Sequence, residues 1–292
     1  MSVGVTGAGR RVAAPVALLQ AMPLGLVLGV FLVVPIALLI VVSFFDYDSV
    51  QIIPGFVWTN YQDVLFSRVT WMIYLNTLKY TVIVWALTLF IGFWVAYVLG
   101  FLVQSKTLQM VLFLLCSIPF LTSNIIRMIS WVPFLGRNGL INGLLLHLGV
   151  IRSPLEWLLF SDFAVVLAFV HLYTLFMVAP IFNTMMRIDR RLIEAAVDGG
   201  AGFWQVIANV IVPLCKPGIA IGSIFIVTLV MGDFITVRLM SGGQSASVGL
   251  MIYNQISLLQ YPAACANAVV LLLTVLLMVG TILRLVDIRK EL

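Results

Sequence analysis

Charged residues are scarce in this chain. Aspartate, glutamate, lysine and arginine make up only 9% of its 292 residues, whereas 63% are hydrophobic. Soluble domains carry about 25% charged residues, because a surface in water needs them. A chain with so few charges has to place most of its surface against lipid. The composition therefore excludes a soluble domain and indicates an integral membrane protein.

Several chemical motifs are also missing. The three cysteines, Cys116, Cys215 and Cys265, show no CxxC spacing, so neither a disulfide framework nor a cysteine metal site is expected. His147 and His171 are isolated, which argues against a histidine metal site. No G-x-x-x-x-G-K-[ST] pattern occurs, so the chain has no ATP-binding loop of its own.

The formal net charge is +5, with 16 basic and 11 acidic residues. Such an excess could indicate nucleic-acid binding, but membrane proteins accumulate lysine and arginine in their cytoplasmic loops. We therefore expect membrane lipid and no nucleic acid among the partners.

Six stretches are apolar over the roughly 20 residues that a membrane span requires. The sequence therefore predicts an all-α polytopic membrane protein with six transmembrane helices. We expect a cytoplasmic N-terminal tail (1–15), a transmembrane domain (16–286) and a cytoplasmic C-terminal tail (287–292). The predicted spans are Leu18–Phe44, Asn76–Val103, Leu108–Trp131, Phe163–Met186, Gly218–Val237 and Ala263–Leu285.

Two features modify this simple pattern of spans. Pro35, Pro119 and Pro180 lie in or beside spans and predict kinks, because the proline ring removes a backbone donor and clashes one turn back. The apolar run Leu140–Val150 is too short to cross the bilayer, and we expect a re-entrant or interfacial helix on the outer face.

Lysine and arginine are divided unequally between the two sides of the predicted bundle. With the N-terminus inside, ten lie on the cytoplasmic side and six on the outer side, which favours N- and C-termini in the cytoplasm. The inner group is Arg10, Arg11, Lys106, Arg187, Arg190, Arg191, Lys216, Arg284, Arg289 and Lys290; the outer group is Arg68, Lys79, Arg127, Arg137, Arg152 and Arg238.

The predicted cytoplasmic passage RRLIEAAVDGGAGFWQVIANVIVPLCKPGI, residues 190–219, interrupts the apolar pattern. Asp189 is placed to cap a first helix, and Gly199 and Gly200 to end it, because glycine reaches left-handed backbone angles without strain. A second, amphipathic helix follows, and Pro213 and Pro217 are expected to stop it before the next span. On periodicity alone, the passage could be an ordinary connector.

A particular spacing within this passage favours a more specific interpretation. Glu194-Ala195-Ala196 is followed after three residues by Gly200, and Pro213 stands thirteen residues after the glycine. This resembles the EAA loop of binding-protein-dependent ABC importer permeases, E-A-A, three residues, G, nine residues, then I-x-L-P. Val210 and Val212 take the places of the isoleucine and the leucine.

The resemblance implies a type I ABC importer permease-like fold in which loop 187–217 contains a cytoplasmic coupling helix. It also implies the partners: a cytoplasmic ATPase dimer that binds ATP and Mg, a second, paralogous permease subunit and a periplasmic or extracellular solute-binding protein. No cofactor is expected in this chain, and the location would be the bacterial inner membrane. The residues predicted to couple to the ATPase are Glu194, Ala195, Ala196, Asp198, Gly200 and Pro213.

Two outer segments resemble spermidine/putrescine-type permease subunits. They are SNIIRMISW with LGRNGLINGLLLHLGVIRSPLEWLL, and GDFITVRLMSGGQSASVGLMIYNQI. The resemblance implies a polyamine substrate. Related importers of ferric iron, opines or phosphonates share parts of these segments and remain alternatives.

Asp233 is the one acid well inside a predicted span, which makes it a functional candidate. A polyamine binds carboxylates and aromatic faces, and Trp131 and Tyr253 could supply the latter. Arg127 is predicted at a similar depth, so a structural Asp233–Arg127 pair is the alternative to a role in the pathway. The predicted substrate-pathway residues are Asp233, Arg127, Trp131 and Tyr253.

Two other functional classes fit the sequence less well. An ion-coupled secondary transporter often shows inverted repeats and several intramembrane charges, and neither is evident. An intramembrane enzyme would need HExxH, paired intramembrane aspartates or a catalytic arrangement of serine and histidine inside spans, and no such pattern is evident. The sequence therefore favours a transport subunit without catalytic residues.

Overall fold

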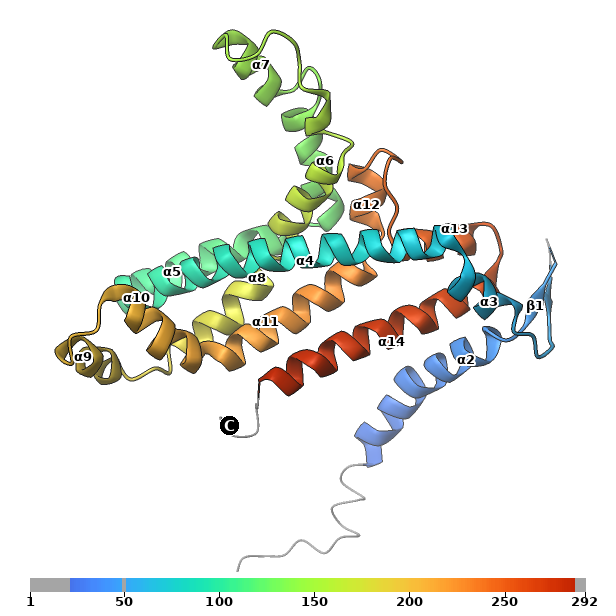
Figure 1. Cartoon of the computed structure of the whole chain (residues 1–292), viewed down its shortest axis with the longest axis horizontal. Coiled ribbons are helices and arrows are strands. Elements are labelled where there is room, and N and C mark those ends of the chain that lie inside the picture. Colours follow the sequence, from blue (N-terminus) through green and yellow to red (C-terminus); the bar gives the residue numbers. More distant parts are fainter. Residues whose placement is uncertain (1–21, 49–50, 287–292) are drawn as a thin grey trace, which may run out of the picture.

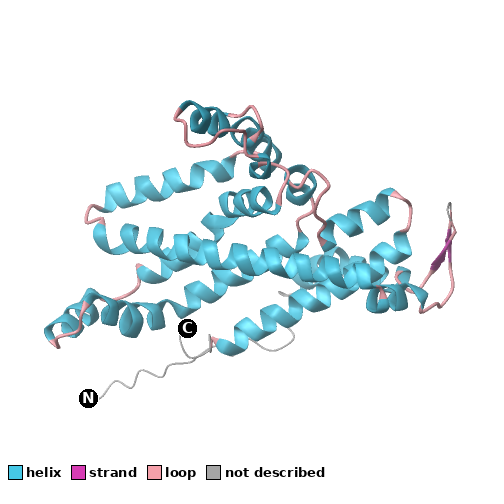
Figure 2. Ribbon diagram, turned by 45° about the horizontal axis from the view of Figure 1, so that its top comes forward, coloured by secondary structure: helices cyan, strands magenta, loops and turns pink. Residues whose placement is uncertain are grey.

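The computed structural model describes residues 22–48 and 51–286. Helices dominate this part of the chain (Figures 1 and 2), which confirms the all-α prediction. One small hairpin is added to it, in which β1 (Asp46–Tyr47) pairs antiparallel with β2 (Ile52–Ile53). The predicted tail 1–15 and the tail 287–292 lie outside the described residues.

The helices form a bundle of long elements with short ones at its two ends and one side. The first described helix covers Met22–Val42 and contains the π-helical turn η1 (Gly29–Val33) followed by α2 (Val34–Val42). After the hairpin come α3 (Thr59–Phe66), α4 (Arg68–Tyr97), η2 (Val98–Leu102), α5 (Lys106–Ser117), η3 (Ile118–Leu121), α6 (Asn124–Leu135), α7 (Leu140–His147) and η4 (Glu156–Leu158). The remaining elements are α8 (Asp162–Met185), α9 (Arg190–Asp198), α10 (Phe203–Val206), η5 (Ile207–Ile211), α11 (Val212–Gly232), α12 (Ile235–Met240), α13 (Val248–Ser257) and α14 (Tyr261–Leu285).

Five helices of the described chain are long and apolar enough to cross a membrane, and a sixth span results if one bent pair is counted as a span. This agrees with six predicted spans. The five are Met22–Val42, Arg68–Leu102, Glu156–Met185, Phe203–Gly232 and Tyr261–Leu285.

The third predicted span, Leu108–Trp131, is broken next to Pro119, where the sequence predicts a kink. The chain bends by 90° between Lys106–Leu121 and Asn124–His147. Pro119 lies in the 3₁₀ turn η3, and Thr122 is extended, so the backbone cannot continue the α-helical hydrogen bonds. Figure 1 shows that α6 and α7 consequently project from the side of the bundle, where α7 confirms a short helix within the predicted run Leu140–Val150.

The core of the bundle is α8, which packs against α4 on one side and α11 on another. Glycines make this packing close. A Cβ on Gly92 of α4 would lie 2.8 Å from Met177 Cγ, and one on Gly222 of α11 would lie 2.6 Å from Met177 Sδ. Gly218 and Gly222 form a G-x-x-x-G spacing, which allows helix backbones to approach each other in lipid.

We expect Gly218→Ala to destabilise the bundle. A Cβ there would lie 2.6 Å from the backbone oxygen of Pro180 and 2.5 Å from Thr184 Oγ1, and overpacking of this kind costs about 1–3 kcal/mol. Gly280→Ala in α14 is the matched control, because no atom lies within 4 Å of its Cβ position. Thermal unfolding in detergent should show a lower midpoint for the first variant alone; equal shifts would contradict the close-packing explanation.

Candidate functional site

The predicted coupling passage forms an elbow, α9 followed by α10, at the end of the bundle opposite α13 and the hairpin (Figure 1). Its first helix begins as the sequence predicts. The Asp189 carboxylate accepts a hydrogen bond from the backbone N–H of Arg191 at 3.0 Å, which satisfies a donor that the first turn of a helix leaves free.

The turn after α9 explains why glycine is required at position 200. The N–H of Ala201 donates to the carbonyl of Ala196 at 3.0 Å, and the N–H of Gly200 to that of Val197 at 2.8 Å. This pair of bonds is the Schellman motif, which places the residue after the cap in the left-handed region. Gly200 has φ +87°, whereas Gly199 has an ordinary φ of −73°.

The expectation that Pro213 and Pro217 stop the second helix is wrong. α10, η5 and α11 form one continuous helix from Phe203 to Gly232, so the fifth span starts much earlier than predicted at Gly218 and ends before Val237. The π-helical turn η5 widens the backbone just before Pro213 and displaces the carbonyl that its ring would otherwise meet. The second arm of the elbow is therefore directly continuous with a membrane span.

Within residues 22–48 and 51–286, α9 is largely uncovered. No residue of α9 is buried, and the side chains of Glu194, Ala195 and Asp198 are exposed. Leu192 and Val197 are 50% and 55% exposed on different sides of the helix, since Leu192 lines a pocket with α8 and α11 whereas Val197 lines a second pocket with α4 and α10. Protein interfaces mix polar and apolar groups in the same way.

Asp233 lies at a break between α11 and α12 and is fully engaged there. Its Oδ2 accepts hydrogen bonds from the Tyr173 hydroxyl at 2.5 Å and the Thr236 hydroxyl at 2.7 Å. Its Oδ1 accepts from the Thr236 backbone N–H at 2.9 Å. The carboxylate thus caps the start of α12 and ties the break to α8.

The alternative expectation of an Asp233–Arg127 ion pair is wrong. Lys79 pairs with Asp162 and Arg137 with Glu156, and within residues 22–48 and 51–286 no ion pair joins Asp233 to Arg127. Arg127 donates to Asn124 Oδ1 at 2.5 Å and is only 8% exposed. Its buried Nε has no hydrogen-bond partner among the described residues.

The two predicted aromatic pathway residues lie on different elements and have different partners. Trp131 on α6 donates from its ring nitrogen to His171 Nδ1 on α8 at 3.0 Å. Tyr253 on α13 stacks on Phe234, next to Asp233, with ring centroids 4.7 Å apart, and the guanidinium of Arg238 lies 4.8 Å from the Tyr253 ring. A hydrogen bond from Arg238 also holds the pKa of the Tyr253 hydroxyl below its ordinary value.

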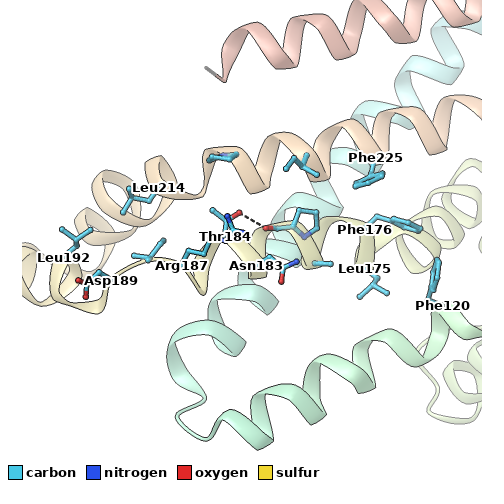
Figure 3. Close-up of a pocket in the computed structure, with 15 residues that line it drawn as sticks. Phe120, Leu175, Phe176, Asn183, Thr184, Arg187, Asp189, Leu192, Leu214 and Phe225 are labelled. Atoms are coloured by element: carbon cyan, nitrogen blue, oxygen red, sulfur yellow. Dashed lines mark hydrogen bonds between the residues drawn. The ribbon is translucent and has the colours of Figure 1, made fainter. Parts of the chain in front are cut away.

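A groove of about 1010 Å³ runs along α8 and α11 (Figure 3). Figure 3 shows Phe120, Phe176 and Phe225 at one end and Asp189 and Leu192 at the other. The groove thus extends from the middle of the spans to the cap of α9. Its lining also includes Leu175, Ala179, Pro180, Asn183, Thr184, Arg187, Ile188, Leu214, Pro217 and Ile221.

Sequence reasoning missed this groove and the Tyr173 contact to Asp233. The available signal was the polar pair Asn183 and Thr184 inside a predicted span, because polar residues within spans usually face a cavity. It also missed that Lys79 pairs with Asp162 at 2.5 Å.

A bundle of apolar spans, with an uncovered helix at one end and an open groove leading toward it, has the architecture of a membrane transport subunit. Residues 88–288 match the family described as "Binding-protein-dependent transport system inner membrane component". This match covers more than half of the chain, and the chain therefore belongs to this family of ABC importer permeases. It is a multi-pass inner-membrane protein and a transport component.

Curated relatives give the same result over most of the chain. The spermidine/putrescine transport system permease protein PotB of Escherichia coli strain K12 is 32% identical over 255 residues, which are 87% of this chain and 90% of the relative. PotB of Haemophilus influenzae is 31% identical over 77% of this chain and 78% of its own length. A crystal structure of a bacterial ABC transporter that imports the acidic polysaccharide alginate has the same fold, with a TM-score of 0.75, 20% identity and coverage of 92% of this chain and 94% of the other.

Proposed function

We propose that this chain forms half of the translocation pathway of an ATP-driven importer and that α9 docks on a separate ATPase subunit. The proposal depends chiefly on the elbow. The helix α9 exposes Glu194, Ala195 and Asp198, and the second arm of the elbow continues without interruption into the span Phe203–Gly232. Movement of a docked α9 would therefore be transmitted to a helix that lines the groove.

Docking of α9 on an ATPase also implies how the chain is oriented in the membrane and which other partners it has. The α9 end and both termini face the cytoplasm, where the ATPases bind ATP and Mg. A second, paralogous permease subunit faces the open groove of α8 and α11 and completes the pathway. A solute-binding protein docks at the opposite end; support for such a partner comes from an alginate ABC transporter whose structure is a complex with a pentasaccharide-bound periplasmic protein.

The proposed substrate is a polyamine. Support comes from the relatives named as spermidine/putrescine permeases, which align with most of this chain. The second candidate is an anionic solute such as a phosphonate. It is favoured by Arg127, which is buried and has no ion pair among the described residues.

Reconstitution tests these substrates directly. The chain, its partner permease, the ATPases and the binding protein are assembled in proteoliposomes, and ATP hydrolysis is measured with each candidate solute. We expect spermidine or putrescine to stimulate hydrolysis, whereas phosphonates, opines and ferric iron do not. Stimulation by an anionic solute alone would transfer the assignment to the second candidate.

A further inference from the structure

Three aromatic rings from separate elements meet at the end of the groove that lies opposite Asp189 and Leu192. Phe176 of α8 lies between the other two, with its ring centroid 5.3 Å from that of Phe120 in η3 and 5.9 Å from that of Phe225 in α11. Figure 3 shows these three side chains gathered together, and we name them the aromatic collar. The collar is therefore the place where η3, at the bend of the third span, meets α8 and α11.

Their surroundings distinguish these rings from rings that face lipid. Phe120 and Phe225 are 51% and 44% exposed, yet they line a cavity that also contains Asn183 and Thr184. Polar side chains within spans face protein or water, because hydrocarbon cannot satisfy them. The groove is therefore a space that a hydrated solute can enter.

The charged groups of the groove do not select for a cation. Arg187 and Asp189 line its other end and carry opposite charges, so together they contribute no net charge. Aromatic rings attract cations through their negative faces when the cation lies within about 6 Å of the centroid. The ring spacings of 5.3 and 5.9 Å allow one ammonium group to contact two neighbouring rings.

The collar also connects to the helix break. The ring of Tyr173, about one turn before Phe176 on α8, has its centroid 6.2 Å from that of Phe176. The Tyr173 hydroxyl is the group that hydrogen-bonds to Asp233. A series of aromatic rings therefore leads from the Asp233 carboxylate to the groove.

We propose that the aromatic collar is a binding site for the ammonium groups of a transported organic amine. The site lies between the helix break at Asp233 and the part of the groove that leads to α9. The proposal depends on the polyamine assignment, since an anionic solute would gain nothing from these ring faces. Phe120, Phe176 and Phe225 are then determinants of substrate selectivity that act without any acidic residue.

Leucine and tyrosine substitutions in the complete reconstituted transporter test the proposal. Phe176→Leu and Phe225→Leu keep the apolar volume but remove the ring, and uptake of spermidine should fall about fivefold or more, as expected for a lost cation–π contact. Phe176→Tyr and Phe225→Tyr keep the ring and should retain most of the uptake. Stepwise fluorination of the ring at position 176 should lower uptake in proportion to the weakened ring face.

Phe90→Leu provides the matched control, because Phe90 of α4 is 67% exposed and does not line the groove. Wild-type uptake in the leucine variants, or equal losses in the leucine and tyrosine variants, overturns the collar while leaving the polyamine assignment intact. A wild-type transporter that ignores amines overturns the polyamine assignment and the collar together.

Discussion

Replacing Gly200 by valine is expected to reduce substrate-stimulated ATP hydrolysis and uptake about tenfold or more. At φ +87°, a side chain with a Cβ costs roughly 1–2 kcal/mol, and β-branching adds to this cost. The chain can relieve that strain only by abandoning the Schellman bonds of Ala201 and Gly200, which set the angle between α9 and α10. A tenfold loss of productive docking corresponds to about 1.4 kcal/mol.

Gly199 offers a control one residue away. Its φ of −73° is one that alanine adopts readily, so Gly199→Ala should stay within about twofold of wild type, as most surface substitutions do. Both variants should reach the membrane in normal amounts, because Gly200 is exposed and outside the core. Co-purification of the ATPase and its stimulated activity are the measurements. Equal activity of Gly200→Val and wild type would show that the turn geometry does not matter for coupling.

The ends of α9 could be predicted from the sequence because they depend on local interactions. Asp189 binds the residue two positions later, and Gly200 takes part in bonds within a single turn. Hydrophobic runs likewise identified the spans, since length and apolarity are local properties. The size of the bend in Leu108–Trp131 and the continuation of the helix through Pro213 depend on more than local sequence. A proline such as Pro119 predicts a kink but not its angle, and a π-helical turn such as η5 can accommodate a proline that the sequence suggests as a stop.

The candidate pathway could not be predicted in the same way because its contacts join distant parts of the chain. Tyr173 and Asp233 are 60 residues apart, and Phe120, Phe176 and Phe225 belong to three different elements. Hydrophobic spans without clear periodicity do not reveal which face meets which neighbour. Similar predicted depth suggested an Asp233–Arg127 pair, but depth does not determine rotation about the helix axis, and Tyr173 is the residue that reaches the carboxylate.

Asp233→Asn is expected to impair uptake while the complex still assembles. The two carboxylate oxygens of Asp233 accept three hydrogen bonds, two of them from the hydroxyls of Tyr173 and Thr236, whereas asparagine has one uncharged acceptor oxygen and cannot keep all three. Hydrogen bonds to a charged group contribute about 1.5–3 kcal/mol each, so the tie between the α11–α12 break and α8 is weakened. The core contacts of Gly92, Gly218 and Met177 are unaffected, so the bundle itself should remain folded.

A double-mutant cycle with Tyr173→Phe separates the two roles that Asp233 could have. If Asp233 acts only by fixing the helix break through Tyr173, each single variant and the double variant should lose uptake to the same extent, because all three lack the same bond. If the carboxylate also contacts the passing amine, the loss in Asp233→Asn should differ between spermidine and putrescine, whereas an additional loss that is equal for both amines reflects its bonds to Thr236. Thr236→Ser keeps both the hydroxyl and the backbone donor and serves as the control. Wild-type uptake in Asp233→Asn would remove this residue from the pathway, and the collar would then remain to be tested through Phe176 and Phe225 alone.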